Sequence, residues 1–156
     1  MPRVLTLIAA SCVLALSAGA QKTRLTLSGF TGAMGTAAVT DFDNGSMQSA
    51  TAIAYTVAII TPSTGTARTA TVSISATTTT LNGTKPISDL QWRRNDLATW
   101  NSMTTTPVAV DSRSAFSGTG ATFSNSIWLR VLLNWATDPA SSYSTTVVIT
   151  LSVTVP

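Results

Sequence analysis

Asp41 and Asp43 form the only close acidic pair in the chain, and paired carboxylates are the groups that acid–base hydrolysis uses. They stand directly before Asn44-Gly45. Because Asp and Asn before Gly are typical of turns, a structural turn is the favoured interpretation, ahead of a calcium site and of catalysis. An EF-hand loop would also need a glutamate at its twelfth position, which is missing here.

The chain has few residues that could carry out other kinds of catalysis. The chain contains no histidine and no glutamate, and its one cysteine is Cys12. Serine hydrolysis lacks both a histidine base and a G-x-S-x-G turn, and a Ser-Lys dyad could draw only on Lys22 or Lys85. We therefore expect a noncatalytic protein with no metal and no other cofactor.

The four tryptophans are the stronger candidates for a binding function. Trp92 and Trp135 share the parity of apolar neighbours, which predicts that both lie in the core. Trp128 alternates with apolar residues, and Trp100 lies in an irregular stretch. An exposed tryptophan can stack on a sugar ring, so Trp100 and Trp128 are the candidate ligand-binding residues. Burial by a neighbouring loop or subunit is the favoured alternative for both.

The elements that must position these residues are strands, because apolar residues recur with a period of two. The clearest alternation covers 53–59, 70–76, 127–135 and 143–155. Shorter candidate strands are 23–28, 37–42, 87–93, 107–110 and 121–123.

Turn-rich segments separate these strands, which predicts a single immunoglobulin-like antiparallel β-sandwich of about seven to nine strands. We expect the segment 136–142 to join the last two long strands as a hairpin, with Trp135 near Tyr143.

The first 20 residues have the pattern of an export signal. Arg3 precedes an apolar run from Val4 to Leu16, and Ala18-Gly19-Ala20 fits the small-residue cleavage rule. We expect residues 1–20 to be removed and 21–156 to form the domain, secreted to the extracellular surface or periplasm. The apolar run is too short for a stable membrane span. Cys12 lies within this signal, so a lipid anchor is a minor alternative.

The charge pattern argues against nucleic acid as a partner. The formal net charge is +3, and cleavage would remove the contribution of Arg3. Nucleic-acid binding needs clustered basic residues with aromatic residues between them, and only Arg93 and Arg94 are adjacent. The favoured interpretation of that pair is a solvated strand end.

Two segments carry a family resemblance: the tyrosine-led strand 143–155, and 41–45 leading into the strand at 50–60. With the signal and the Thr/Ser-rich β pattern, they resemble the spore coat protein U and chaperone-usher pilin-like group of secreted bacterial domains. The resemblance implies a role in surface fibres, coats or adhesion, with a periplasmic chaperone as a transient partner and no catalytic residues.

Leu25 and Leu27 alternate with polar residues directly after the expected cleavage site. They are the candidate assembly strand, by which one subunit would pair with another. The favoured alternative is that they belong to the first strand of their own sandwich. We therefore expect a noncatalytic structural or adhesive surface component that self-associates. The alternative function is a carbohydrate-binding module that uses exposed tryptophan to contact a surface polysaccharide.

Overall fold

The computed structural model describes residues 23–29, 34–60, 67–82, 84–118, 120–138 and 143–154. The expected signal and its cleavage site therefore lie outside the described residues, as does Lys22. Within the described ranges, no helix has both the length and the apolar character needed to cross a membrane.

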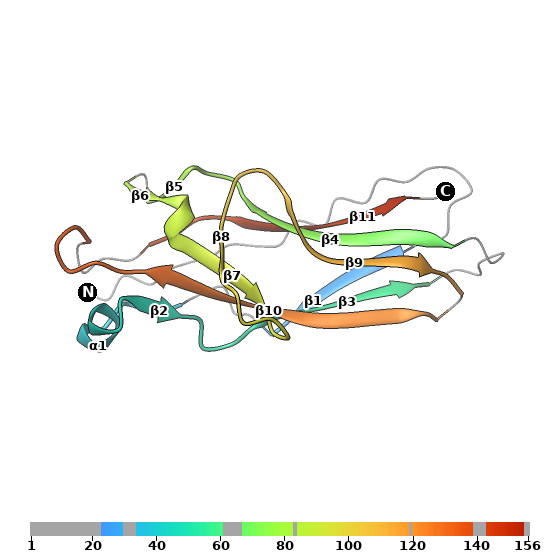
Figure 1. The fold of residues 1–156 in the computed structure, drawn as a ribbon, viewed down its shortest axis with the longest axis horizontal. Helices are drawn as coiled ribbons and strands as arrows, with labels where there is room; N and C mark the ends of the chain where they lie inside the picture. Colours follow the sequence, from blue (N-terminus) through green and yellow to red (C-terminus); the bar gives the residue numbers. More distant parts are fainter. Residues whose placement is uncertain are drawn as a thin grey trace.

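The described strands pair only antiparallel and form two main layers (Figure 1). The larger sheet has the order β1-β3-β10-β7-β8, with β2 also paired to β10. The smaller sheet has the order β11-β4-β9, and β5 pairs with β6 in a separate hairpin. This arrangement confirms the all-β antiparallel sandwich that the period of two predicts.

The strand bounds are β1 (Thr23–Ser28), β2 (Ser46–Gln48), β3 (Ile53–Ile59), β4 (Arg68–Ala76), β5 (Thr80–Leu81), β6 (Lys85–Pro86), β7 (Leu90–Arg94), β8 (Asn101–Ser102), β9 (Val108–Phe116), β10 (Thr122–Leu132) and β11 (Val147–Thr154). Two short helices, α1 (Val39–Asp43) and η1 (Ile87–Asp89), complete the described elements.

The core lies between the two sheets and is built mainly from one face of β3, β4, β10 and β11. In β3 every second residue from Ile53 to Ile59 is buried, and β4 alternates in the same way over most of its length. Val57, Val72 and Leu129 are fully enclosed. Burying these apolar faces supplies the main driving force of the fold, and the alternation explains why sequence parity located these strands.

Two strand predictions are corrected by the structure. The segment 37–42 is largely helical, because α1 begins at Val39. Its Asp41 carboxylate accepts a hydrogen bond from the Ala38 backbone N–H at 2.8 Å, which stabilises the first helical turn. The segment 87–93 begins with the short helix η1 before β7 starts at Leu90.

The predicted hairpin between the last two long strands is also wrong. β10 belongs to the larger sheet and β11 to the smaller one, so the chain crosses from one layer to the other between them. Trp135 is 58% exposed instead of buried. β10 ends at Leu132, so the parity of the strand no longer sets the direction of Trp135. Trp92, by contrast, is buried as predicted.

Candidate functional site

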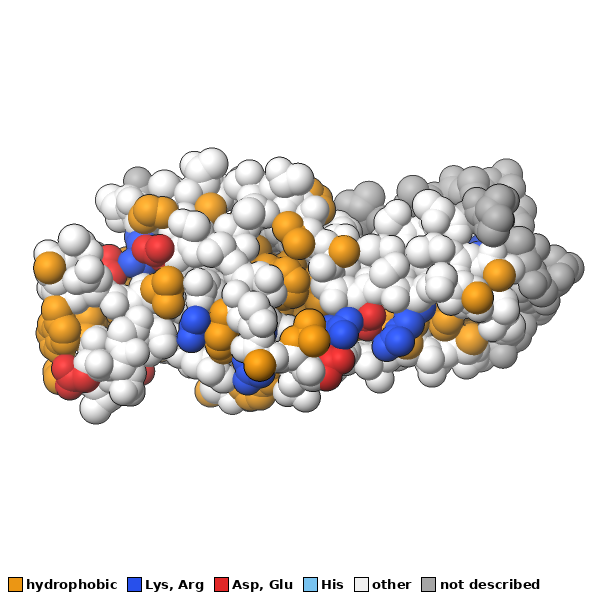
Figure 2. Space-filling view, in the orientation of Figure 1, with side chains coloured by type: hydrophobic (Ala, Val, Ile, Leu, Met, Phe, Trp, Pro, Cys, Tyr) orange, Lys and Arg blue, Asp and Glu red, His pale blue; other side chains and the backbone are white. Residues whose placement is uncertain are grey.

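The outer face of the larger sheet carries the two tryptophans predicted to bind a ligand. Arg93 of β7 lies opposite Trp128 of β10, and Gln91 lies opposite Arg130. Trp128 and Arg130 alternate with buried residues of β10, so their side chains point away from the core. We call Gln91, Arg93, Trp100, Trp128 and Arg130 the arginine–tryptophan face. Figure 2 shows separate basic side chains on one side of the molecule, several of them beside acidic ones.

Trp100 joins this face from the segment before β8. The guanidinium carbon of Arg130 lies 4.4 Å from the centroid of the Trp100 ring, and that of Arg93 lies 5.1 Å away. Both distances are within the range of an attractive cation–π interaction. The structure therefore brings Trp100 and Trp128 to one face, on which Arg93 and Arg130 both contact the Trp100 ring.

The polar contacts of this face are to neutral groups. Arg130 donates from Nε to Gln91 Oε1 at 2.8 Å, and Arg93 donates to the Leu97 carbonyl at 3.1 Å. Trp128 donates from Nε1 to Asn95 Oδ1 at 2.9 Å. These hydrogen bonds hold the side chains in place without neutralising either guanidinium group.

No carboxylate among the described residues forms an ion pair with Arg93 or Arg130. The nearest acidic residue along the chain, Asp96, is instead bound by Arg94 at 2.5 Å. Burial and the neighbouring charge of Arg93 lower the pKa of Arg130 from its ordinary value. Within the part of the chain that the structure describes, the two positive charges of this face are therefore not paired with a carboxylate.

The predicted assembly residues Leu25 and Leu27 lie on β1. This strand pairs with β3 over its full length, from Thr23 opposite Ile59 to Ser28 opposite Ala54. Leu25 is buried, and Leu27 packs against the core while partly exposed. The structure thus places this segment as an edge strand of its own sheet.

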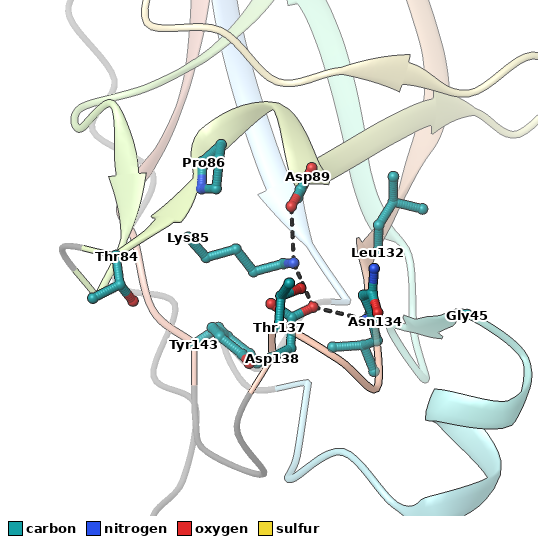
Figure 3. Close-up of a pocket in the computed structure, with 11 residues that line it drawn as sticks. Gly45, Thr84, Lys85, Pro86, Asp89, Leu132, Asn134, Thr137, Asp138 and Tyr143 are labelled. Carbon is teal, nitrogen blue, oxygen red and sulfur yellow. Dashed lines mark hydrogen bonds and ion pairs between the residues drawn. The ribbon is translucent and has the colours of Figure 1, made fainter.

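A pocket of about 810 Å³ lies at one end of the sandwich, between β6, η1 and the segment after β10 (Figure 3). Within it, Lys85 Nζ lies 2.7 Å from Asp138 Oδ2 and 2.8 Å from Asp89 Oδ2. Burial lowers the pKa of Lys85, but its hydrogen bonds to Asp138 and Asp89 outweigh that effect and raise the pKa overall.

Lys85 is therefore held as an ammonium ion, whereas the base of a Ser-Lys dyad must be neutral. The lysine instead connects β6 to the segment after β10. The charges that line this pocket are satisfied by one another, as the dashed contacts in Figure 3 show. These ion pairs link β6, η1 and the segment after β10.

Asp41 and Asp43 both lie on α1, and their carboxylates make different contacts. Asp41 binds the backbone at the start of α1, and Asp43 accepts a hydrogen bond from Trp135 Nε1 at 3.2 Å. The Trp135 ring also lies 4.7 Å from that of Phe42. No group of three or more potential metal-ligating side chains occurs in the described ranges. The two carboxylates therefore have distinct local roles in and around α1.

A second polar cluster links the two sheets through their interior. Tyr55 of β3 donates a hydrogen bond to Asp111 of β9 at 3.0 Å, and Arg94 of β7 lies 3.0 Å from the same carboxylate. Arg94 also donates to the Val110 carbonyl at 3.2 Å. The Asp111 side chain is 3% exposed, so these contacts replace the water that it would otherwise bind.

This cluster predicts a loss of stability in alkaline solution. Burial and the adjacent Asp111 raise the pKa of Tyr55 well above its ordinary value, which is about 10 in an unfolded chain. Above that pH the unfolded state releases the phenol proton while the folded state keeps it. The free energy of unfolding should therefore be unaffected below about pH 10 and fall as pH rises further.

The measurement is urea unfolding of the intact protein and of Tyr55→Phe between pH 8 and pH 11. Lys85, whose pKa is also raised, contributes a fall of the same sign in both proteins. Tyr55→Phe should consequently show a shallower decline than the unchanged protein. Equal slopes for the two proteins would contradict the assignment of the effect to Tyr55.

Sequence reasoning missed the residues that complete these clusters. Arg93 was interpreted as part of a solvated strand end, yet it contacts the Trp100 ring. Its alternation with the buried Leu90 and Trp92 was a usable signal, since it places Arg93 on the outer face of β7. No sequence signal links Tyr55 to Asp111, because their contact joins two sheets across 56 positions.

Comparison of the chain with protein-family models, with curated proteins and with solved structures finds no match.

Proposed function

We propose that this chain is a noncatalytic structural subunit, exported to the cell surface or periplasm, whose copies associate side by side through strand pairing. The observation that carries the proposal is the pair of edge strands β1 and β11. They end their respective sheets and lie close to each other across the sandwich. We call this pair the open side.

The hydrogen bonds of the neighbouring strand show which backbone N–H and carbonyl groups of an edge strand point to its free edge. The N–H and the carbonyl of Ile59 both form hydrogen bonds on the β10 side of β3 and not on the β1 side. Thr23, which lies opposite Ile59, therefore directs its own N–H and carbonyl away from β3. In an antiparallel ladder this direction alternates along the strand. Leu25 and Leu27 therefore present backbone groups to the free edge, while their side chains face the core.

The same reasoning applies to β11. Ala76, opposite Val147, donates its N–H to Thr104 on the far side of β4, whereas Thr77 donates to Thr146. By alternation, Val147, Ile149, Leu151 and Val153 direct their N–H and carbonyl groups to the free edge. Among the described residues no strand pairs with that edge.

The third long edge strand, β9, is built differently. Its pairing with β4 is interrupted by two register shifts, and Ala115 has a positive φ of 55°. It also carries the charged residues Asp111 and Arg113. Bulges and charges are the features by which proteins protect sheet edges from pairing. β11 has an uninterrupted eight-residue register and no charged residue, so it remains suited to pairing.

A proline in β11 tests this proposal. Val153→Pro removes an N–H from the free edge and places the proline ring there, leaving the ladder to β4 intact. The intact protein should associate as its concentration rises in sedimentation velocity, and Val153→Pro should remain monomeric while keeping its β-sheet circular dichroism. The matched control is Ser152→Pro, which removes a bond to β4 and should instead lower the melting temperature.

Two results would contradict the proposal. One is an intact protein that stays monomeric at the highest concentration measured. The other is a folded Val153→Pro that associates as strongly as the intact protein.

A further inference from the structure

The arginine–tryptophan face lies away from the open side, because β7 and β1 are separated by β10 and β3 in the sheet order. A function of this face is therefore independent of strand pairing at β1 and β11. Two of its features have no role in the proposed assembly: its two tryptophans, and its two arginines, which form no ion pair with a carboxylate among the described residues.

The arginines are arranged to bind an anion. Each is oriented by the Trp100 ring and by one hydrogen bond to a neutral group, and among the described residues nothing else binds the remaining guanidinium N–H groups. A planar guanidinium fork matches the two oxygens of a carboxylate and can bind them through two parallel hydrogen bonds. By contrast, Lys85, Arg94 and Arg113 each form an ion pair with an aspartate among the described residues.

The surrounding groups suit a sugar. Gln91 and Asn95 use their amide oxygens to accept bonds from Arg130 and Trp128, so their NH₂ groups are available to sugar hydroxyls. Trp128 and Trp100 are each partly exposed, and a partly exposed indole ring can pack against the apolar face of a sugar ring. Charge and aromatic surface thus occur together on this face.

We propose that the arginine–tryptophan face binds an acidic polysaccharide, with a uronate carboxylate on Arg93 and Arg130 and a sugar ring against Trp128. Nucleic acid is the less suitable polyanion, because proteins that bind it usually place a longer series of basic residues along its phosphate backbone. This face has two such arginines, Arg93 and Arg130.

The test is a fluorescence titration of the intact protein with sodium polygalacturonate at low salt, using tryptophan emission as the signal. Binding should saturate and should weaken in about 0.5 M sodium chloride, where the Debye length is only a few ångströms. Neutral dextran should bind far more weakly than polygalacturonate.

Single substitutions locate the site. Arg130→Gln should weaken binding about tenfold, as expected for the loss of a charge-assisted bidentate contact. Arg93→Gln is the second variant and should give a comparable loss. The matched control is Arg24→Gln, which removes one exposed charge from β1, at the other end of the same sheet, and should leave the affinity unchanged.

The proposal is overturned if polygalacturonate does not bind, or if Arg24→Gln weakens binding as much as Arg130→Gln. It is also overturned if dextran binds equally well, since the arginines would then not select the ligand. Tighter binding of dextran sulfate or of a single-stranded oligonucleotide would exclude the uronate assignment. Circular dichroism of each variant establishes that the loss of affinity occurs in folded protein.

Discussion

Ile149→Asp is expected to prevent folding. Ile149 is 1% exposed and lies in the middle of β11, on the face that packs into the core. The substitution removes a buried aliphatic side chain, which costs about 2 to 5 kcal/mol when it is truncated to alanine. It also places a carboxyl group in an apolar site, where it must be desolvated or protonated. Together these effects approach the whole stability of a domain, about 5 to 15 kcal/mol.

Thr150→Asp is the matched control, because it introduces the same group one residue later. Thr150 points to the outer face of the smaller sheet and is partly exposed. This variant should be recovered as soluble protein with a melting temperature close to that of the unchanged chain. Comparable loss of soluble protein for both variants would show that β11 is covered on both faces.

Asp111→Ala should lower the free energy of unfolding by about 3 kcal/mol, because it leaves buried partners of a charged group unpaired. Tyr55, 1% exposed, loses the acceptor for its hydroxyl, and Arg94 loses one of its two carboxylates. The contact also connects β3 and β7 of one sheet to β9 of the other. Urea unfolding of the two proteins at pH 7 measures the difference.

Asp96→Ala provides the control for this prediction. Asp96 also binds Arg94, through two hydrogen bonds, but its side chain is 51% exposed. Exposed ion pairs contribute little to stability because water and salt screen them. The loss for Asp96→Ala should be much smaller than for Asp111→Ala. Equal losses of unfolding free energy in the two variants would contradict the prediction, because they would show that burial of Asp111 does not strengthen its contacts.

The period-two pattern predicted β3, β4 and β11 well because each has one buried face and one more exposed face over most of its length. β9 does not alternate in this way, and the pattern predicted only its beginning. Val57 and Ile59 in β3 and Ile149 in β11 occupy the parity that the pattern assigned to the core. Local alternation suffices for such strands, since the sheet geometry directs successive side chains to opposite faces. The same rule predicted that Trp92 is buried and that Trp128 faces outward.

The wrong predictions arose where the local pattern had no such constraint. Segment 37–42 alternates like a strand, but hydrogen bonding by Asp41 and packing of Phe42 favour a short helix there. Trp135 follows the end of β10, so its position depends on Phe42 and Asp43 of α1 and not on strand parity.

By itself, the sequence determined the all-β class, the parity of the long strands and the scarcity of catalytic side chains, because these depend on composition and on neighbouring residues. Tertiary structure decided which strands share a sheet and which of the described strands lie at a sheet edge. It also brought Trp100 to Arg93 and Arg130, and Tyr55 to Asp111. Those contacts join distant segments through packing of one sheet on another, and no local pattern encodes them.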